Sequence, residues 1–166
     1  MLVFNGSLKL KVLEAVELRP TTWSTRFNSW VSGGSQQSGG SSTSSISAAQ
    51  LDPYVNIDVD EMHVGSTGTK PKTSHPTWNE DFSSEVHNGR SIGFTVFHDC
   101  AIPPDDFIAN ASIHFEDLAS SDGNAVGRTN GKGTDFWVDL EPYGKLHVRI
   151  ELHGAMSQGI PAWWRA

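Results

Sequence analysis

Hydrophobic and polar residues alternate along several short segments of the chain. The clearest segment is residues 146–152, where leucine, valine and isoleucine are separated by histidine, arginine and glutamate. The same period of two occurs in residues 8–12 and 55–59. This period predicts β-strands with one buried face and one solvated face. Further candidate strands are residues 62–69, 77–86, 91–98, 107–115 and 135–140, and residues 115–119 suggest a short helical turn.

Glycine, proline and asparagine separate these segments at frequent intervals. About eight short strands with such turns predict an all-β fold, an eight-stranded antiparallel β-sandwich. The functional groups of a sandwich tend to lie in the loops at its ends. Two connections are unusual, residues 19–50 and the aspartate-bearing stretch 96–107. Residues 120–133 are rich in glycine and asparagine and are expected to form a plain surface loop.

Composition refines this picture. Residues 32–50 are almost all serine, glycine and other small or polar types, so we expect a disordered insertion there. The chain has 166 residues, which suits one domain, and a formal net charge of −7. This acidic balance argues against nucleic-acid binding, which needs a basic face. It also argues against adsorption of the whole surface to an anionic membrane, although a local basic patch can override the total.

The sequence also lacks several signatures. Cys100 is the single cysteine, so no intrachain disulfide is expected. The N-terminus has no charged region followed by an apolar core, and no apolar run approaches membrane-spanning length. There is no Gly-rich nucleotide loop, no His-Arg-Asp motif and no cluster of cysteines and histidines typical of a zinc-bound module. We therefore expect an intracellular segment with no enzymatic activity and no cofactor.

Several motifs converge on one family. The runs LDPYV at 51–55, TKPKTSHPTWNEDF at 69–82, VFHDCAIPPDDFIANASI at 96–113 and WVDL at 137–140 together resemble a C2 domain. The runs EAVELRPTTWS at 14–24, GSTGTKPKT at 65–73 and WVDLEPYG at 137–144 are similar to the C2 domain of novel, calcium-independent protein kinase C, epsilon/eta class. The resemblance covers residues 1–154, with the insertion at 32–50, and implies that residues 155–166 link to a following domain.

The resemblance implies a permuted order of the eight strands and a regulatory role. The parent protein would be a serine/threonine protein kinase, and this segment its non-catalytic module for calcium-independent membrane targeting. Its expected partners are an anionic phospholipid membrane, an anchoring protein and other domains of the parent kinase. Its expected location is the cytoplasm, with translocation to membranes.

The stretch at 96–107 contains three aspartates and is therefore a candidate calcium loop. Calcium takes six to eight oxygen ligands, usually with several carboxylates. The resemblance implies that calcium-binding C2 domains supply about five aspartates from two loops. Asp52 and Asp106 match two of these positions, whereas the others fall near Thr22 and on His98 and Cys100. We therefore expect no metal at this site and interpret Asp52 and Asp106 as remnants of a calcium site.

Other interpretations apply to the same stretch. Asp105 and Asp106 suit a turn before a strand, with their side chains capping backbone amides. His98 and Cys100 would share one face of an extended strand and could offer two zinc ligands, while Asp99 would point the other way. A structural zinc site needs four ligands, and no second pair is evident in the sequence. Cys100 is therefore expected to be a small packed residue.

Without calcium, membrane attachment depends on side chains. Aromatic residues suit the bilayer interface, and cations pair with phosphate head groups, for which the resemblance implies phosphatidic acid in particular. Trp23 also suits packing at the base of its loop, and the two lysines suit a solvated edge that discourages strand pairing. The candidate lipid-binding residues are Trp23, Arg26, Phe27, Trp30, Ile102, Pro103, Lys70 and Lys72.

The competing hypothesis is a pure protein-interaction module without direct lipid binding. Residues 14–21 resemble the region through which this kinase class is thought to engage anchoring proteins, and residues 98–106 resemble a segment proposed to mimic such an anchor. An ordinary core strand end and an autoinhibitory contact with the parent kinase are the alternatives. The candidate residues are Glu14, Ala15, Val16, Glu17, Leu18, Arg19, Pro20 and Thr21.

Overall fold

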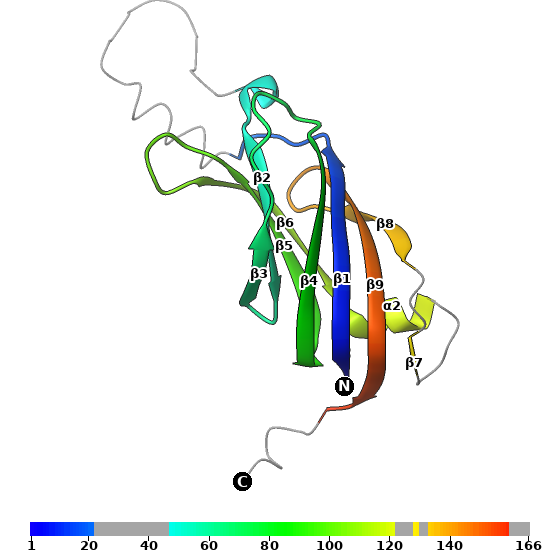
Figure 1. Cartoon of the computed structure of the whole chain (residues 1–166). Helices are drawn as coiled ribbons and strands as arrows, with labels where there is room; N and C mark the ends of the chain where they lie inside the picture. Colours follow the sequence, from blue (N-terminus) through cyan, green and yellow to red (C-terminus); the bar gives the residue numbers. More distant parts are fainter. Residues whose placement is uncertain (22–46, 122–127, 130–132, 160–166) are drawn as a thin grey trace, which may run out of the picture.

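The structure is a computed structural model that describes residues 1–21, 47–121, 128–129 and 133–159. Its strands form two antiparallel sheets packed face to face (Figure 1). The strands are β1 (Leu2–Val16), β2 (Pro53–Val59), β3 (Met62–Ser66), β4 (Thr77–Gly89), β5 (Ser91–His98), β6 (Asp106–His114), β7 (Arg128–Thr129), β8 (Thr134–Asp139) and β9 (Lys145–Gln158). A 3-10 turn, η1 (Ala48–Gln50), and a short helix, α2 (Phe115–Ser121), complete the described elements. No described helix has the length and apolar character needed to cross a membrane.

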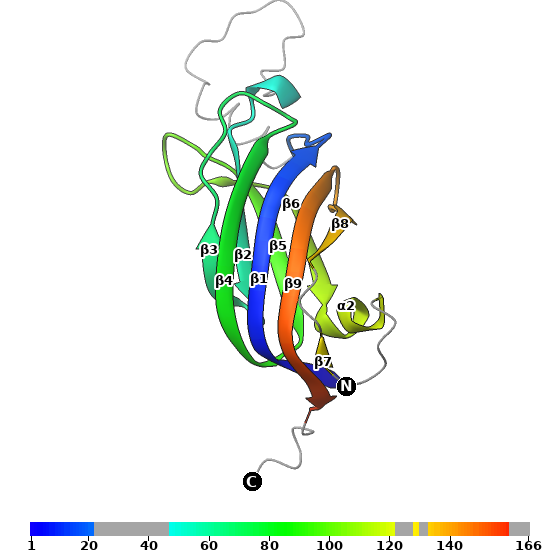
Figure 2. The ribbon, with the colours of Figure 1, turned by 45° about the vertical axis from the view of Figure 1, so that its right-hand side comes forward.

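The larger sheet is built on two long strands near the chain ends. β1 pairs with β4 on one side and with β9 on the other, and both β7 and β8 pair with β9. Leu8 lies opposite Leu152, so the inward-facing residues of the two alternating segments meet. Gly6 lies opposite Gly154 in these two strands. A Cβ atom on either glycine would collide with the backbone of the other strand, so the close approach requires glycine at both positions. Figure 2 shows β4, β1 and β9 side by side.

The smaller sheet has the order β3-β2-β5-β6. In β2 and β5 the burial alternates residue by residue, as the sequence period predicts. Their buried residues pack against those of the larger sheet and form one continuous core. Phe4 and Phe115, whose ring centroids are 5.1 Å apart, stack within this core, so α2 closes one end of the sandwich.

The predicted β-sandwich is confirmed, and each predicted strand has a counterpart. β1 and β9 extend well beyond the segments that alternate most clearly, and β9 continues to Gln158, past the expected domain boundary at residue 154. The predicted helical turn corresponds to α2. The expected plain loop at 120–133 is wrong in part, because residues 120–121 belong to α2 and residues 128–129 pair with β9.

The connections gather at two opposite ends of the sandwich. We call one the loop end, which consists of residues 17–21, 47–52, 67–76, 99–105 and 140–144. Backbone hydrogen bonds join these loops, for example from Leu18 N to Ser74 O at 3.1 Å and from Asp99 N to Asp52 O at 2.9 Å. The opposite, terminal end carries the N-terminus and the end of β9 (Figure 2).

Candidate functional site

The β5–β6 loop, residues 99–105, projects from the sandwich at the loop end (Figure 1). Asp105 holds this loop through both carboxylate oxygens. Its Oδ2 accepts the Tyr54 hydroxyl at 2.5 Å, and its Oδ1 accepts the Cys100 backbone N–H at 2.9 Å. Burial and then the bond to Asp105 raise the pKa of Tyr54 far above its ordinary value, so the phenol stays a donor. Asp105 therefore caps a backbone amide, as the sequence predicts.

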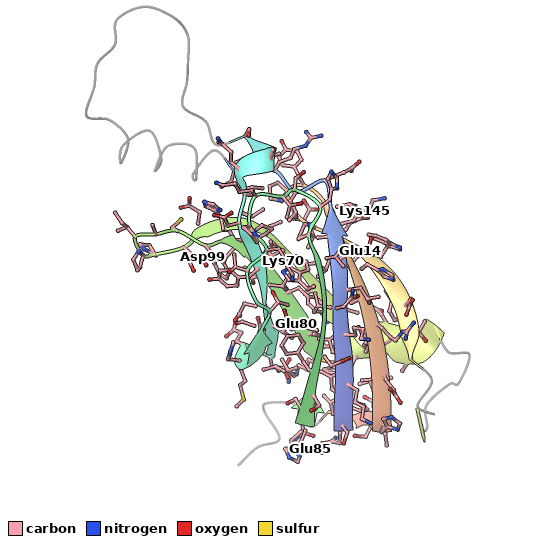
Figure 3. The ribbon with its side chains drawn as sticks, turned by 45° about the horizontal axis from the view of Figure 1, so that its top comes forward. Glu14, Lys70, Glu80, Glu85, Asp99 and Lys145 are labelled. Carbon is pink, nitrogen blue, oxygen red and sulfur yellow. The ribbon has the colours of Figure 1, made fainter. Side chains whose placement is uncertain are left out.

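Two further aspartates join neighbouring loops. Asp99 is exposed, and its Oδ2 accepts the Thr69 hydroxyl at 2.9 Å. Asp52 Oδ1 accepts the Lys72 backbone N–H at 2.8 Å. Figure 3 labels Asp99 and Lys70, which come from the β5–β6 and β3–β4 connections at this end. These carboxylates therefore serve as hydrogen-bond acceptors that fasten the loops to each other.

His98, Cys100 and Asp106 form a separate group. One ligand atom from each lies within 4.8 Å of the others. His98 Nδ1 accepts the Asp52 backbone N–H at 2.9 Å, and Cys100 Sγ lies 3.6 Å from the His98 carbonyl oxygen. Asp106 Oδ2 is buried and has no hydrogen-bond partner, which a role as a turn cap does not explain. Among the described residues, Asp52 does not belong to this group, so the two proposed calcium remnants do not share it.

The tip of the β5–β6 loop is apolar and exposed. Ile102 is 59% exposed, and Pro103 and Pro104 are exposed beside it. Lys70 and Lys72 also have exposed side chains, while their backbone amides donate to Pro53 O and to Asp52 Oδ1. The loop end thus presents an apolar tip and a pair of cations on a backbone that is well fixed.

Trp23, Arg26, Phe27 and Trp30 lie outside the described residues. Their lipid-binding role stays a prediction.

The predicted protein-interaction segment is largely built into the fold. Ala15 and Leu18 are core residues, and Ala15 N donates to Pro76 O at 3.0 Å. The Thr21 hydroxyl donates to Phe107 O at 3.1 Å. Glu17 and Arg19 have exposed side chains, and the Arg19 guanidinium lies 5.1 Å from the centre of the Tyr143 ring. Only part of residues 14–21 can therefore contact a partner while the strand end stays folded.

A polar and aromatic cluster on the outer face of the larger sheet was not predicted. Trp137 is 51% exposed and stacks on His147, with ring centroids 4.6 Å apart. The His147 ring lies between Glu14 and Asp135, at 3.7 and 3.5 Å. Arg149 holds Asp135 at 2.6 Å and lowers the pKa of that carboxyl. The available signal was the position of Trp137 among the outward residues of an alternating strand.

Comparison with known proteins identifies the family. A family model described as "C2 domain" matches residues 6–140, and the chain belongs to this family.

Its relatives specify the kind of C2 domain. The chain is 45% identical over 160 residues to "Protein kinase C-like 1B" of Caenorhabditis elegans, covering 96% of this chain and 19% of that protein. It is 40% identical over 158 residues to "Protein kinase C epsilon type" of Oryctolagus cuniculus, covering 95% and 19%. It is 38% identical over 157 residues to "Protein kinase C eta type" of Homo sapiens, covering 93% and 20%. The chain thus spans about a fifth of the length of these relatives, and the predicted resemblance to this class is confirmed.

Solved structures agree on the fold. A calcium-bound structure of two domains of Extended-Synaptotagmin 2 matches with a TM-score of 0.61 at 21% identity, covering 92% of this chain and 47% of that one. A structure described as "Structure of a C2 domain" matches with a TM-score of 0.56 at 17% identity, covering 89% and 97%. At this level of identity the likeness shows the architecture alone.

Proposed function

We propose that this C2 domain is the non-catalytic regulatory module of a protein kinase C-type serine/threonine kinase and attaches to anionic phospholipid without calcium. The exposed apolar tip at Ile102 and Pro103, at the same end of the sandwich as the exposed cations Lys70 and Lys72, is the observation that carries the proposal. The kinase relatives support the role of the parent protein. The module would be cytoplasmic and would move to membranes.

Calcium independence is supported by how the carboxylates are used. Asp52 and Asp99 accept hydrogen bonds from the β3–β4 connection, and Asp105 accepts one from Cys100 of its own loop. A calcium ion would have to compete with these bonds, and it prefers oxygen ligands to the His98 imidazole and the Cys100 thiol. Among the described residues, Asp52, Asp99 and Asp105 join no group of converging ligand atoms, so a hard cation would find few carboxylates at one point.

Lipid attachment would combine insertion with charge. An exposed isoleucine can enter the interface, and each lysine near an anionic surface contributes about 1 kcal/mol. Trp23, Arg26, Phe27 and Trp30 would add aromatic anchors and a cation from the neighbouring connection, with phosphatidic acid as the proposed lipid. The sum is weak, reversible binding, which suits a regulatory module.

A second candidate function is contact with an anchoring protein or with another domain of the parent kinase. Trp137 favours this function, because exposed tryptophans are enriched in interfaces. It stacks on His147, whose ring lies between Glu14 and Asp135. Glu17 and Arg19 are the members of the predicted segment whose side chains are exposed.

Sedimentation with vesicles of phosphatidic acid and phosphatidylcholine, in chelator, tests the lipid proposal. We expect binding that falls about fivefold for each lysine removed in Lys70→Ala and Lys72→Ala. We also expect it to fall in Ile102→Ser, Trp23→Ala and Arg26→Ala. Met62→Ser is the matched control, because Met62 is 76% exposed but lies at the opposite end of β2 and β3. Equal losses in Ile102→Ser and Met62→Ser would contradict the proposed surface.

Absence of lipid binding by the wild-type chain would instead favour the protein-interaction hypothesis. Calorimetric titration with calcium provides the complementary test. We expect no binding at micromolar calcium, since the carboxylates described at this end do not converge on one point. A micromolar site would refute calcium independence.

A further inference from the structure

The cluster of His98, Cys100 and Asp106 lies at the base of the β5–β6 loop. His98 ends β5, Asp106 begins β6, and the two residues are direct cross-strand partners. Cys100 comes from the first residues of the loop, and the Cys100 N–H bond to Asp105 holds its backbone there. The strand pairing and the loop anchor together bring one ligand atom of each residue within 4.8 Å of the others.

The polar side chains of this group are buried, so their polar atoms need bonding partners. His98 is 7% exposed and Asp106 is 4% exposed. Asp106 Oδ2 accepts no hydrogen bond, although buried polar atoms of folded proteins nearly always have a partner. The Asp106 carboxyl also interacts with the Cys100 thiol, and a cation held by the three side chains would give this carboxylate the partner that Oδ2 lacks.

The three side chains also select among cations. Imidazole nitrogen, thiolate sulfur and carboxylate oxygen together are ligands of Zn²⁺, whereas calcium takes oxygen ligands. We propose that His98, Cys100 and Asp106 form a zinc-binding site with a fourth position open to water. Among the described residues, no further histidine, cysteine or acidic side chain joins the group. The sequence alone offered only His98 and Cys100, and the third ligand was counted there as a calcium remnant.

Binding requires small, definable changes. Ligand atoms on one tetrahedral zinc ion are about 3.5 Å apart, so separations of up to 4.8 Å must close by on the order of 1 Å. Because His98 Nδ1 accepts the Asp52 N–H, the neutral ring carries its proton on Nε2. Coordination through Nδ1 would replace the bond to Asp52 directly, and coordination through Nε2 would move its proton to Nδ1, so either mode breaks the bond to Asp52.

The thiol must also lose its proton. In the metal-free chain Cys100 Sγ donates to the His98 carbonyl oxygen at 3.6 Å, so it carries a proton there. The ion replaces the proton on Sγ, one zinc–sulfur bond forms, and one proton leaves to solvent for each ion bound. No electron is transferred. Because Cys100 is half-buried, the ion can reach the group from solvent.

Titration of the 166-residue chain with Co²⁺, followed by displacement with Zn²⁺, tests the proposal. We expect a thiolate-to-cobalt charge-transfer band that saturates at a single ion per chain and disappears when Zn²⁺ is added. Cys100→Ser should abolish the band and weaken zinc binding by at least about tenfold. Asp106→Asn should weaken binding too, provided that its metal-free spectrum shows a native fold.

Asp99→Asn is the matched control, because Asp99 lies between two of the ligands but bonds to Thr69 instead. We expect it to bind zinc within about twofold of wild type. In an NMR titration with Zn²⁺, the Asp52 amide resonance should shift, since its acceptor is lost. Absence of the cobalt band, its persistence in Cys100→Ser, equal loss in Asp99→Asn or an unmoved Asp52 amide would each overturn the site. The lipid-binding assay is run in chelator, so its outcome does not depend on zinc binding.

Discussion

The two ends of the sandwich bury different kinds of side chain. At the terminal end, Phe4 and Phe115 stack in an apolar environment. Toward the loop end lie Thr67, His98 and Asp106, the buried polar or charged residues among those that the structure describes. The apolar end requires only complementary shape. The polar end requires a partner for each buried group, and Asp106 Oδ2 has none within the described part of the chain.

This difference separates stability from function. Apolar burial contributes about 1.5–3 kcal/mol for each large side chain and is indifferent to direction. Buried polar groups depend on direction, and a protein retains them where they fasten a loop or bind a ligand. The loop end contains both uses, because Asp105 fastens the β5–β6 loop whereas Asp106 faces the candidate metal ligands.

The largest effect on stability is expected at the terminal end. Phe4→Ala should lower the free energy of unfolding by about 3–5 kcal/mol, because it removes a fully buried ring and its stacking contact with Phe115. Urea denaturation measures the loss. Met62→Ala, at a side chain that is 76% exposed, should change stability by less than about 0.5 kcal/mol. A loss below about 1 kcal/mol in Phe4→Ala would mean that α2 does not close the core.

A smaller effect is expected at the loop end. Asp105→Ala should cost about 2 kcal/mol, because it removes the acceptor of both the Tyr54 hydroxyl and the Cys100 amide. Denaturation of the metal-free chain is the measurement. Asp99→Ala is the control, since exposed Asp99 loses only its bond to Thr69 and should cost less than about 1 kcal/mol. Equal losses in the two variants would show that Asp105 does not fasten the loop.

The smallest effect concerns the exposed face of β8 and β9, which belongs to neither end. Arg149→Gln should raise the titration midpoint of the Asp135 carboxyl, because the Arg149 hydrogen bond lowers that pKa in the wild type. The pair contributes stability above the unfolded pKa of aspartate, and this contribution is lost as the pH falls through the folded pKa. NMR titration of the side-chain carboxyl measures the shift. An unchanged midpoint would show that the pair does not form in solution.

The sequence predicts much of the architecture because strand alternation is a local property. The strands β2 and β5 and the segment 146–152 of β9 were all recognisable from their period of two. The motif at 51–55 and its partners in order and spacing were sufficient to indicate a C2 domain, which the family match confirms. The full lengths of β1 and β9 were not predictable, since their outer residues depend on pairing with each other.

The candidate site shows the limit of such reasoning. Asp105 and Asp106 are adjacent and both suited a turn cap in the sequence, yet one bonds to Tyr54 and the other lies buried beside His98 and Cys100. Alternation places successive side chains on opposite sides of a strand. It cannot tell which neighbours each one meets, because those neighbours come from β2 and from the loop backbone.

The sequence by itself determined the all-β class and the family, because these follow from local periodicity and from residue types in order. Tertiary structure alone decided that Asp106 joins His98 and Cys100, that Asp105 anchors the loop through Tyr54, and that Ala15 and Leu18 belong to the core. These contacts depend on which segments pack together. Pairing between strands and packing of one loop against another produce these contacts, and neither can be read from local sequence.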